Sequence, residues 1–212
     1  MTKKERAEFC VKQLKIKYPD AVCSLTAADA FQLLVATRLS AQCTDARVNL
    51  VTPALFDAFP SPATMAKASY EQVEELIKSC GLYKTKAKSL VDMANMLCDT
   101  YDGQVPDSLE ELIKLPGIGR KTANLIMGDI YKQPGSVVAD THLIRITNRI
   151  GLVASKDPYQ VEMALRKILP PEESNDFCHR IVHFGREICS ARAPKCNDCP
   201  LAENCKKIGV KP

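Results

Sequence analysis

Apolar residues recur at helical spacing along almost the whole chain, and this periodicity limits the fold more than any other feature of the sequence. The pattern is interrupted mainly by proline, glycine and residues that cap helix ends. Only Ser136 to Ala139 looks extended, and one short strand cannot form a sheet by itself. Helices are expected near residues 3–17, 27–39, 45–58, 84–100, 120–131, 141–150, 158–168 and 175–189. The sequence therefore predicts an all-α protein.

Two further helices and two boundaries follow from local signals. Ser69 with Gln72, and Ser108 with Glu111, have the spacing of capping boxes that open helices. A boundary is expected at Tyr18-Pro19, where the first helix must end, and another at 132–139, where proline and glycine stop a helix. If the first helix packs with the C-terminal part, the chain leaves one lobe, builds a second and returns.

Size and charge restrict the protein class. The 212 residues are 46% hydrophobic, which is enough for a sizeable core. No apolar run approaches the ~20 residues that span a membrane, and the N-terminus is charged, so we expect a cytoplasmic protein. A net charge of +4 permits a nucleic-acid partner that local basic patches would bind. Candidate patches are Lys84, Lys86 and Lys88, and Arg186, Arg192 and Lys195.

Four cysteines near the C-terminus have the spacing of a soft metal centre. They follow the pattern C-x6-C-x2-C-x5-C, and four thiolates on a short tether can close around one centre. Zinc and a [4Fe–4S] cluster both accept four cysteines, and the spacing leaves both open. The four are Cys189, Cys196, Cys199 and Cys205. The six others have no motif spacing and are expected to be small buried residues of a reducing compartment; they are Cys10, Cys23, Cys43, Cys80, Cys98 and Cys178.

The segment LPGIGRKTA joins two short amphipathic stretches through a glycine turn. Gly117 and Gly119 carry no Cβ and can adopt positive φ, so a phosphodiester can approach their N–H groups and the start of the next helix. Ile118, between them, is expected to pack inward. The full string is typical of a helix-hairpin-helix element, which holds DNA by its backbone without reading the sequence of bases.

Lys121 and Asp140 are candidates for imine chemistry. A lysine is a nucleophile only when its amine is neutral, and the helix N-terminus, Arg120 and partial burial would all favour that form at Lys121. The simpler alternative is another phosphate contact. Asp140 has the position of a helix N-cap, and a carboxylate there could also stabilise a developing sugar cation and relay protons.

Taken in order, these motifs resemble the endonuclease III family of the helix-hairpin-helix DNA glycosylase superfamily. The resemblance rests on LPGIGRKTAN (115–124), VADTH (138–142) and the cysteine motif (189–205), with LSAQCTD (39–45) and GLYKTKA (81–87) upstream. It implies a two-lobed all-α fold with a DNA-binding cleft. One lobe is a six-helix barrel, residues 19–134, with the helix-hairpin-helix at about 108–131. The other is an iron–sulfur cluster lobe made of 1–18 and 135–212.

The resemblance also implies roles for single residues. Lys121 matches the Schiff-base nucleophile, Asp140 the catalytic aspartate, and the four motif cysteines the ligands of one [4Fe–4S] cluster. Gln42 matches the residue inserted into the space left by the extruded base, and Leu82 an apolar wedge beside it. The implied DNA contacts are Gln42, Leu82, Gly117, Gly119, Arg120, Arg192 and Lys195.

The implied activity is base-excision repair. A monomer would remove damaged pyrimidines from double-stranded DNA, or act at abasic sites, by glycosylase and AP-lyase steps at the cytoplasmic nucleoid. One alternative is a monofunctional mismatch glycosylase for adenine or for thymine and uracil, which would lack lysine at position 121. Another is a non-catalytic iron–sulfur protein that binds DNA or senses redox state, which would need neither Lys121 nor Asp140.

Overall fold

The computed structural model describes residues 1–210, and helices are the regular secondary structure of that range, with no strand among these residues. The all-α prediction is confirmed. The chain forms two compact units, one made of residues 24–131 and the other of 1–23 and 132–212. The sequence predicted boundaries at 18/19 and 134/135, whereas the two units divide at 23/24 and 131/132. Residues 136–139, expected to be extended, are buried and belong to no strand.

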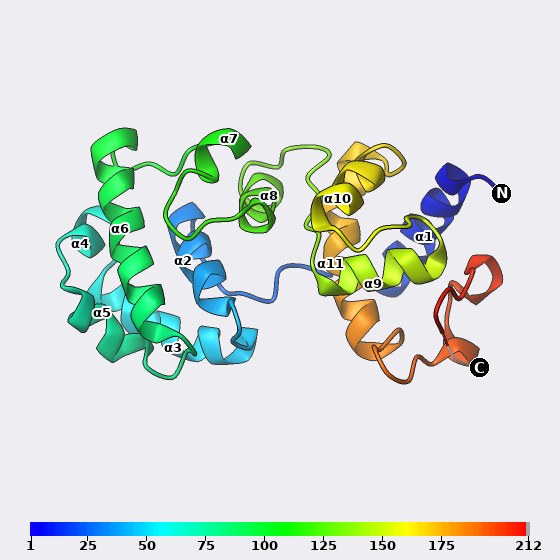
Figure 1. Ribbon diagram of the computed structural model, residues 1–212, viewed down its shortest axis with the longest axis horizontal. Helices are drawn as coiled ribbons and strands as arrows, with labels where there is room; N and C mark the ends of the chain where they lie inside the picture. The colour runs from blue at the N-terminus through cyan, green and yellow to red at the C-terminus, as the bar shows by residue number, and fades with distance from the viewer. Residues whose placement is uncertain (211–212) are drawn as a thin grey trace. The chain divides into compact units, whose positions relative to one another are not determined.

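The 24–131 unit is built around α6, which packs against α4, α5 and α2 (Figure 1). One face of α6 is buried at helical spacing by Ala87, Leu90, Val91, Ala94 and Leu97. Helix α2 also packs against α3 and α8, and α7 packs against α8. The helices are α2 (Ala30–Ser40), α3 (Asp45–Ala58), α4 (Pro62–Ala66), α5 (Tyr70–Ile77), α6 (Tyr83–Tyr101), α7 (Leu109–Leu112) and α8 (Arg120–Asp129).

In the other unit the first helix packs against the last long one. Figure 1 shows α1, in blue, beside the yellow and orange helices, and α11 contacts both α1 and α9. Phe177, Ile181 and Phe184 form the buried face of α11. The elements are α1 (Lys3–Lys17), α9 (Thr141–Ile150), α10 (Pro158–Arg166), η1 (Pro171–Glu173), α11 (Ser174–Glu187), η2 (Cys196–Asp198) and η3 (Ala202–Asn204).

Local capping explains most helix starts. The predicted box at Ser69 and Gln72 is present, with both reciprocal hydrogen bonds. At α7, Ser108 accepts a hydrogen bond from the Glu111 N–H, but the Glu111 carboxylate bonds Tyr101 and Lys114 instead of completing the box. That part of the prediction is wrong, because Tyr101 and Lys114 compete successfully for the carboxylate. Helix α4, which begins after Ser61, was not predicted.

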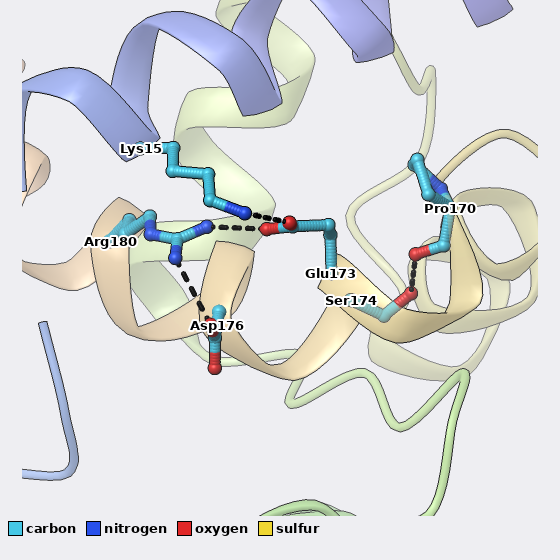
Figure 2. A network of polar contacts seen from close by, with 6 residues as sticks. All are labelled: Lys15, Pro170, Glu173, Ser174, Asp176 and Arg180. Atoms are coloured by element: carbon cyan, nitrogen blue, oxygen red, sulfur yellow. Dashed lines mark hydrogen bonds and ion pairs between the residues drawn. The ribbon is translucent and has the colours of Figure 1, made fainter. Parts of the chain in front are cut away.

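Buried Arg180 is the centre of an ionic network that joins α1, η1 and α11 (Figure 2). Its guanidinium donates to Glu173 at 2.8 Å and to Asp176 at 3.0 Å. Lys15 of α1 donates to the second oxygen of Glu173, and the Ser174 hydroxyl donates to the Pro170 carbonyl at 3.0 Å. The Lys15 hydrogen bond, aided by Arg180, lowers the pKa of Glu173. Glu173 is therefore stabilised in its ionised form in the folded protein.

We expect Glu173→Gln to destabilise the fold by about 2–3 kcal/mol at pH 7, because buried Arg180 loses a charged acceptor. Since the folded pKa of Glu173 is depressed, its contribution is present above the unfolded pKa and is lost as pH falls through the folded pKa. The difference in the free energy of unfolding between variant and wild type should decrease below about pH 4. Urea unfolding at pH 7 and at about pH 3 measures this difference in stability. Glu172→Gln, at the exposed neighbouring position, is the control; equal losses in both variants would contradict the network's role.

No helix within residues 1–210 combines the length and the apolar character needed to cross a bilayer.

Candidate nucleic-acid interface and cysteine centre

The predicted hairpin consists of α7, a glycine turn and α8. Leu115 and Ile118 are buried, and the Ile118 N–H donates to the Leu115 carbonyl at 3.0 Å, which closes the turn. Gly119 is the N-cap of α8 and provides no side-chain hydrogen bond to the helix start. The first N–H groups of a helix have no carbonyl partner within the helix. The turn therefore presents backbone donors and the positive end of the α8 dipole at one place.

The two glycines of this turn have different constraints. Gly117 has φ +78°, and a Cβ there would lie 2.6 Å from Arg38 Nε and 3.1 Å from Ser89 Cβ. Gly119 has φ −102°, so it does not adopt the positive φ that the sequence suggested for both. Within residues 1–210, no atom beyond the adjoining stretch of chain lies within 4 Å of a Cβ built at Gly119. Gly117 is thus required by the fold, whereas Gly119 leaves its outer side open.

Gly117→Ala and Gly119→Ala form a matched pair. We expect Gly117→Ala to cost about 2 kcal/mol or more, because alanine is strained at positive φ and its methyl would collide with Arg38. Gly119→Ala should change stability by about 0.5 kcal/mol or less but weaken DNA binding, since its methyl points into the space a phosphate would occupy. Urea unfolding and fluorescence anisotropy with duplex DNA separate the two effects. Normal DNA affinity in Gly119→Ala would contradict the backbone-contact role.

Lys121 lies in the first turn of α8 and its side chain is exposed, while Arg120 beside it is half-buried. The partial burial expected for Lys121 is not found.

Gln42 and Leu82 occupy two exposed turns with the same unusual backbone. Their φ values are 55° and 60°, in the left-handed region that few non-glycine residues adopt. Leu82 is 59% exposed, although it is a large apolar residue. The Gln42 carbonyl oxygen lies 3.5 Å from a Cβ built at Gly81, so the two turns are neighbours.

Three side chains connect these turns and the hairpin within the 24–131 unit. They are Arg38, Ser89 and Lys86. Arg38 Nε donates to Ser89 Oγ at 2.7 Å, directly beneath Gly117. Lys86 is completely buried, and its Nζ donates to the Leu39 carbonyl at 2.7 Å. Burial lowers the pKa of both Arg38 and Lys86. Lys86 therefore does not belong to the exposed basic patch predicted from the sequence.

Asp140 is the N-cap of α9 in the other unit. Its Oδ1 accepts a hydrogen bond from the Leu143 N–H at 2.7 Å, as the sequence predicted. The side chain is half-buried. The second carboxylate oxygen can still accept protons or face a cation, since a cap uses only one.

The four motif cysteines line one pocket beside Arg149, Phe184 and Leu201. All four are half-buried. Each thiolate charge opposes the others: burial first, and then the neighbouring cysteines, raise the pKa of Cys199 and Cys205. No three His, Cys, Asp or Glu side chains within residues 1–210 converge on a position for a single metal ion.

Two sulfurs of this pocket accept hydrogen bonds. Arg149 Nη1 donates to Cys189 Sγ at 3.5 Å, and the Lys207 N–H donates to Cys205 Sγ at 3.4 Å. Such donors suit sulfurs that carry negative charge, as in a metal–thiolate centre. The chemistry of the pocket therefore fits a group held by four thiolates.

Arg149 also holds the loop that follows Cys189. Its guanidinium is buried and donates to the carbonyls of Ser190 at 2.6 Å and Ala191 at 2.7 Å. Arg192 and Lys195 lie on this loop with exposed side chains. Arg149 of α9 thus fixes the start of a loop that carries two exposed cationic side chains.

The comparisons with known proteins agree with this architecture. Residues 35–171 match the model of the HhH-GPD superfamily base excision DNA repair proteins, and the chain belongs to this superfamily. Its relatives include the endonuclease III of Synechocystis sp., 43% identical over 96% of this chain and 93% of that protein. The endonuclease III of Escherichia coli K12 is 35% identical over 97% of both.

A solved structure of a trapped endonuclease III–DNA covalent intermediate, an estranged-adenine complex, has the same fold. The two sequences are 40% identical, the match covers 98% of this chain and 97% of the solved chain, and the TM-score is 0.91. The resemblance to endonuclease III inferred from the motifs is thus confirmed.

The sequence patterns did not identify Arg38 and Arg149, and they assigned Lys86 to an exposed patch, although all three residues shape these sites. For Arg149 a signal exists, because Arg145 and Arg149 stand four residues apart on one helix face and Arg149 falls among apolar positions. Arg38 and Lys86 depend on partners far away in the sequence.

Proposed function

We propose that this protein is a base-excision repair enzyme of the endonuclease III type, a bifunctional DNA glycosylase and AP lyase for damaged pyrimidines. The observation that carries the proposal is Lys121, an exposed amine in the first turn of α8, directly after a glycine turn suited to a phosphodiester. A relative of 40% identity has been trapped as a covalent intermediate with DNA, which supports covalent chemistry. The enzyme acts as a monomer on double-stranded DNA at the cytoplasmic nucleoid.

The reaction begins when the damaged nucleotide leaves the duplex, which costs a few kcal/mol and less for a poorly stacked lesion. Gln42 enters the space left by the base, and Leu82 wedges the neighbouring stack. Their exposed left-handed turns carry both side chains away from the core. The backbone N–H groups at Gly117 and Gly119, with Arg120, hold the phosphodiester beside Lys121.

The neutral amine of Lys121 attacks C1′ of the sugar and displaces the base. Asp140 stabilises the positive charge that develops on the sugar and helps to take the proton from the lysine. The resulting imine makes the C2′ hydrogens acidic, and β-elimination breaks the strand on the 3′ side. A lysine nucleophile is what separates this reaction from that of a monofunctional glycosylase, whose attacking group is water.

Cys189, Cys196, Cys199 and Cys205 hold one [4Fe–4S] cluster in this proposal. When bound, the cluster crosslinks the last part of the chain and fixes its loops. Arg149 then positions the Cys189–Cys196 loop so that Arg192 and Lys195 follow the DNA backbone.

The activity is tested with duplex DNA that carries one thymine glycol or one abasic site. Wild-type protein should release the base, cut the strand by β-elimination and form a covalent adduct when borohydride is present. Strand cutting without a borohydride adduct would exclude the imine mechanism, and base release without strand cutting would favour a monofunctional glycosylase.

The cofactor is tested by metal analysis. We expect about four iron and four sulfide per chain, with visible absorbance that disappears in Cys196→Ser. Cys98→Ser, which changes a half-buried cysteine in the 24–131 unit, is the control and should keep its iron. One zinc per chain in place of iron would contradict the cluster.

A further inference from the structure

Two cysteines outside the C-terminal motif lie behind the turns of Gln42 and Leu82. Cys43 follows Gln42 directly, and Cys80 lies two residues before Leu82. The Gln42 carbonyl oxygen lies 3.5 Å from a Cβ built at Gly81, which brings the segments of Cys43 and Cys80 side by side, and each thiol acts on the other electrostatically. From the sequence alone, only a packing role was expected for these cysteines. Their pairing across two loops that are nearly forty residues apart in the chain suggests more.

We propose that Cys43 and Cys80 form a redox modification site, a dithiol that a small disulfide such as oxidised glutathione converts into a disulfide bond between the two turns. The bond would be reversible, as disulfides in a reducing compartment usually are.

The two thiols differ in solvent exposure, and this difference determines which one reacts first with the small disulfide. Cys43 is half-buried, so a small disulfide can reach it, whereas Cys80 is completely buried. Burial and the neighbouring Cys43 raise the pKa of Cys80 to about 11, while Lys86 and Arg47 act in the opposite direction. Cys43 is thus the attacking thiol, and Cys80 is the resolving thiol.

The exchange is balanced without any further reagent. The Cys43 thiolate attacks one sulfur of the small disulfide, forms a mixed disulfide and releases one small thiolate. Cys80 loses its proton and attacks the Cys43 sulfur, which releases the second thiolate. The dithiol has then lost two electrons and two protons, and the small disulfide has become two thiols.

The buried ammonium of Lys86 supports this chemistry. Its charge acts on both Cys43 and Cys80, and it is fixed by its hydrogen bond to the Leu39 carbonyl. At Cys80 this charge opposes the effect of burial on the pKa and so favours the thiolate, which is the reactive form. This gives a completely buried lysine a use that packing alone does not.

Bond formation would move the two turns. The Cys43 and Cys80 sulfurs must approach to a bond length of about 2.05 Å, with the dihedral angle about the S–S bond in a narrow range. Gln42 and Leu82 are one and two residues away, and groups that engage a ligand need placement within about 0.5 Å. We therefore expect oxidation to weaken binding of abasic-site DNA; this second part rests on the proposed function.

The test begins with chemistry that needs no DNA. The holoenzyme is incubated with oxidised glutathione, free thiols are alkylated, and non-reduced peptides are mapped by mass spectrometry. We expect a Cys43–Cys80 linked peptide that dithiothreitol removes. In Cys80→Ser, glutathione should remain attached to Cys43, and Cys98→Ser should behave as wild type. A persistent Cys43–glutathione adduct in wild type, or an alkylated Cys80, would overturn the site.

DNA affinity is then compared between oxidised and reduced protein. We expect about a tenfold or larger loss on oxidation, restored by dithiothreitol and absent in Cys43→Ser. A linked peptide with unchanged affinity would refute the coupling to the turns. If reduced protein does not bind abasic DNA at all, the proposed function fails, while the peptide map still decides the modification site.

Discussion

Lys121→Ala removes the borohydride-trapped adduct and lowers base excision and strand cleavage by about 10³-fold or more, as loss of a nucleophile does in other enzymes. The reason is chemical: without the amine no imine can form, and the C2′ hydrogens are not acidified. The fold should survive, because the side chain is exposed and alanine is a good helix former. Trapping gels and single-turnover excision on thymine glycol duplex measure the loss.

Lys114→Ala is the matched control for that variant. Lys114 belongs to the same hairpin and is exposed, and its ammonium pairs with Glu111 at 2.6 Å. Such a surface pair contributes little to stability, so this variant should trap and cleave like wild type. An equal amount of adduct in Lys121→Ala and in wild type would exclude Lys121 as the nucleophile.

Asp140→Asn should lower single-turnover base excision by about 10²-fold, because the charge that opposes the developing sugar cation is removed. Asparagine caps helices as well as aspartate does, so the hydrogen bond from the Leu143 N–H can persist. DNA affinity and thermal stability should stay close to wild type. A fall in excision at constant DNA affinity is the expected signature.

Asp157→Asn is the control for capping. Asp157 caps α10 in the same unit, and its Oδ1 accepts from the Gln160 N–H at 2.8 Å, nearly the same geometry as at Asp140. Excision should be unaffected in this variant. If Asp140→Asn also excises at the wild-type rate, Asp140 is a cap and nothing more.

The sequence predicted best those features that neighbouring residues determine. Helices α1, α3 and α9 begin and end at the predicted residues, since Thr2, Thr44 and Asp140 cap them locally. Helix α4 has five residues, too few to show a helical period, and was missed. The same distinction holds in the hairpin, where the glycine turn was predicted but the φ of Gly119 was not.

Side chains whose surroundings come from distant segments could not be predicted. Lys86 stands in a run of alternating lysines that suggests a solvated face, yet it is completely buried against the Leu39 carbonyl. Its neighbour Lys88 is exposed and pairs with Asp92 at 2.7 Å. Helical spacing distinguishes the faces of α6, but it does not say that one face includes a lysine. The proximity of Cys43 to Cys80 could not be predicted for the same reason, because the two residues come from distant segments of the chain.

The division of the chain has a consequence for synthesis. Residues 24–131 form one continuous unit, whereas the other unit needs both residues 1–23 and residues 132–212. Domains form as the chain leaves the ribosome, N-terminal parts first. The continuous unit can therefore fold while α1 still lacks the α11 surface against which it packs. Until α11 emerges, the apolar face of α1 has no permanent partner, so this helix is where we expect a chaperone to bind the nascent protein.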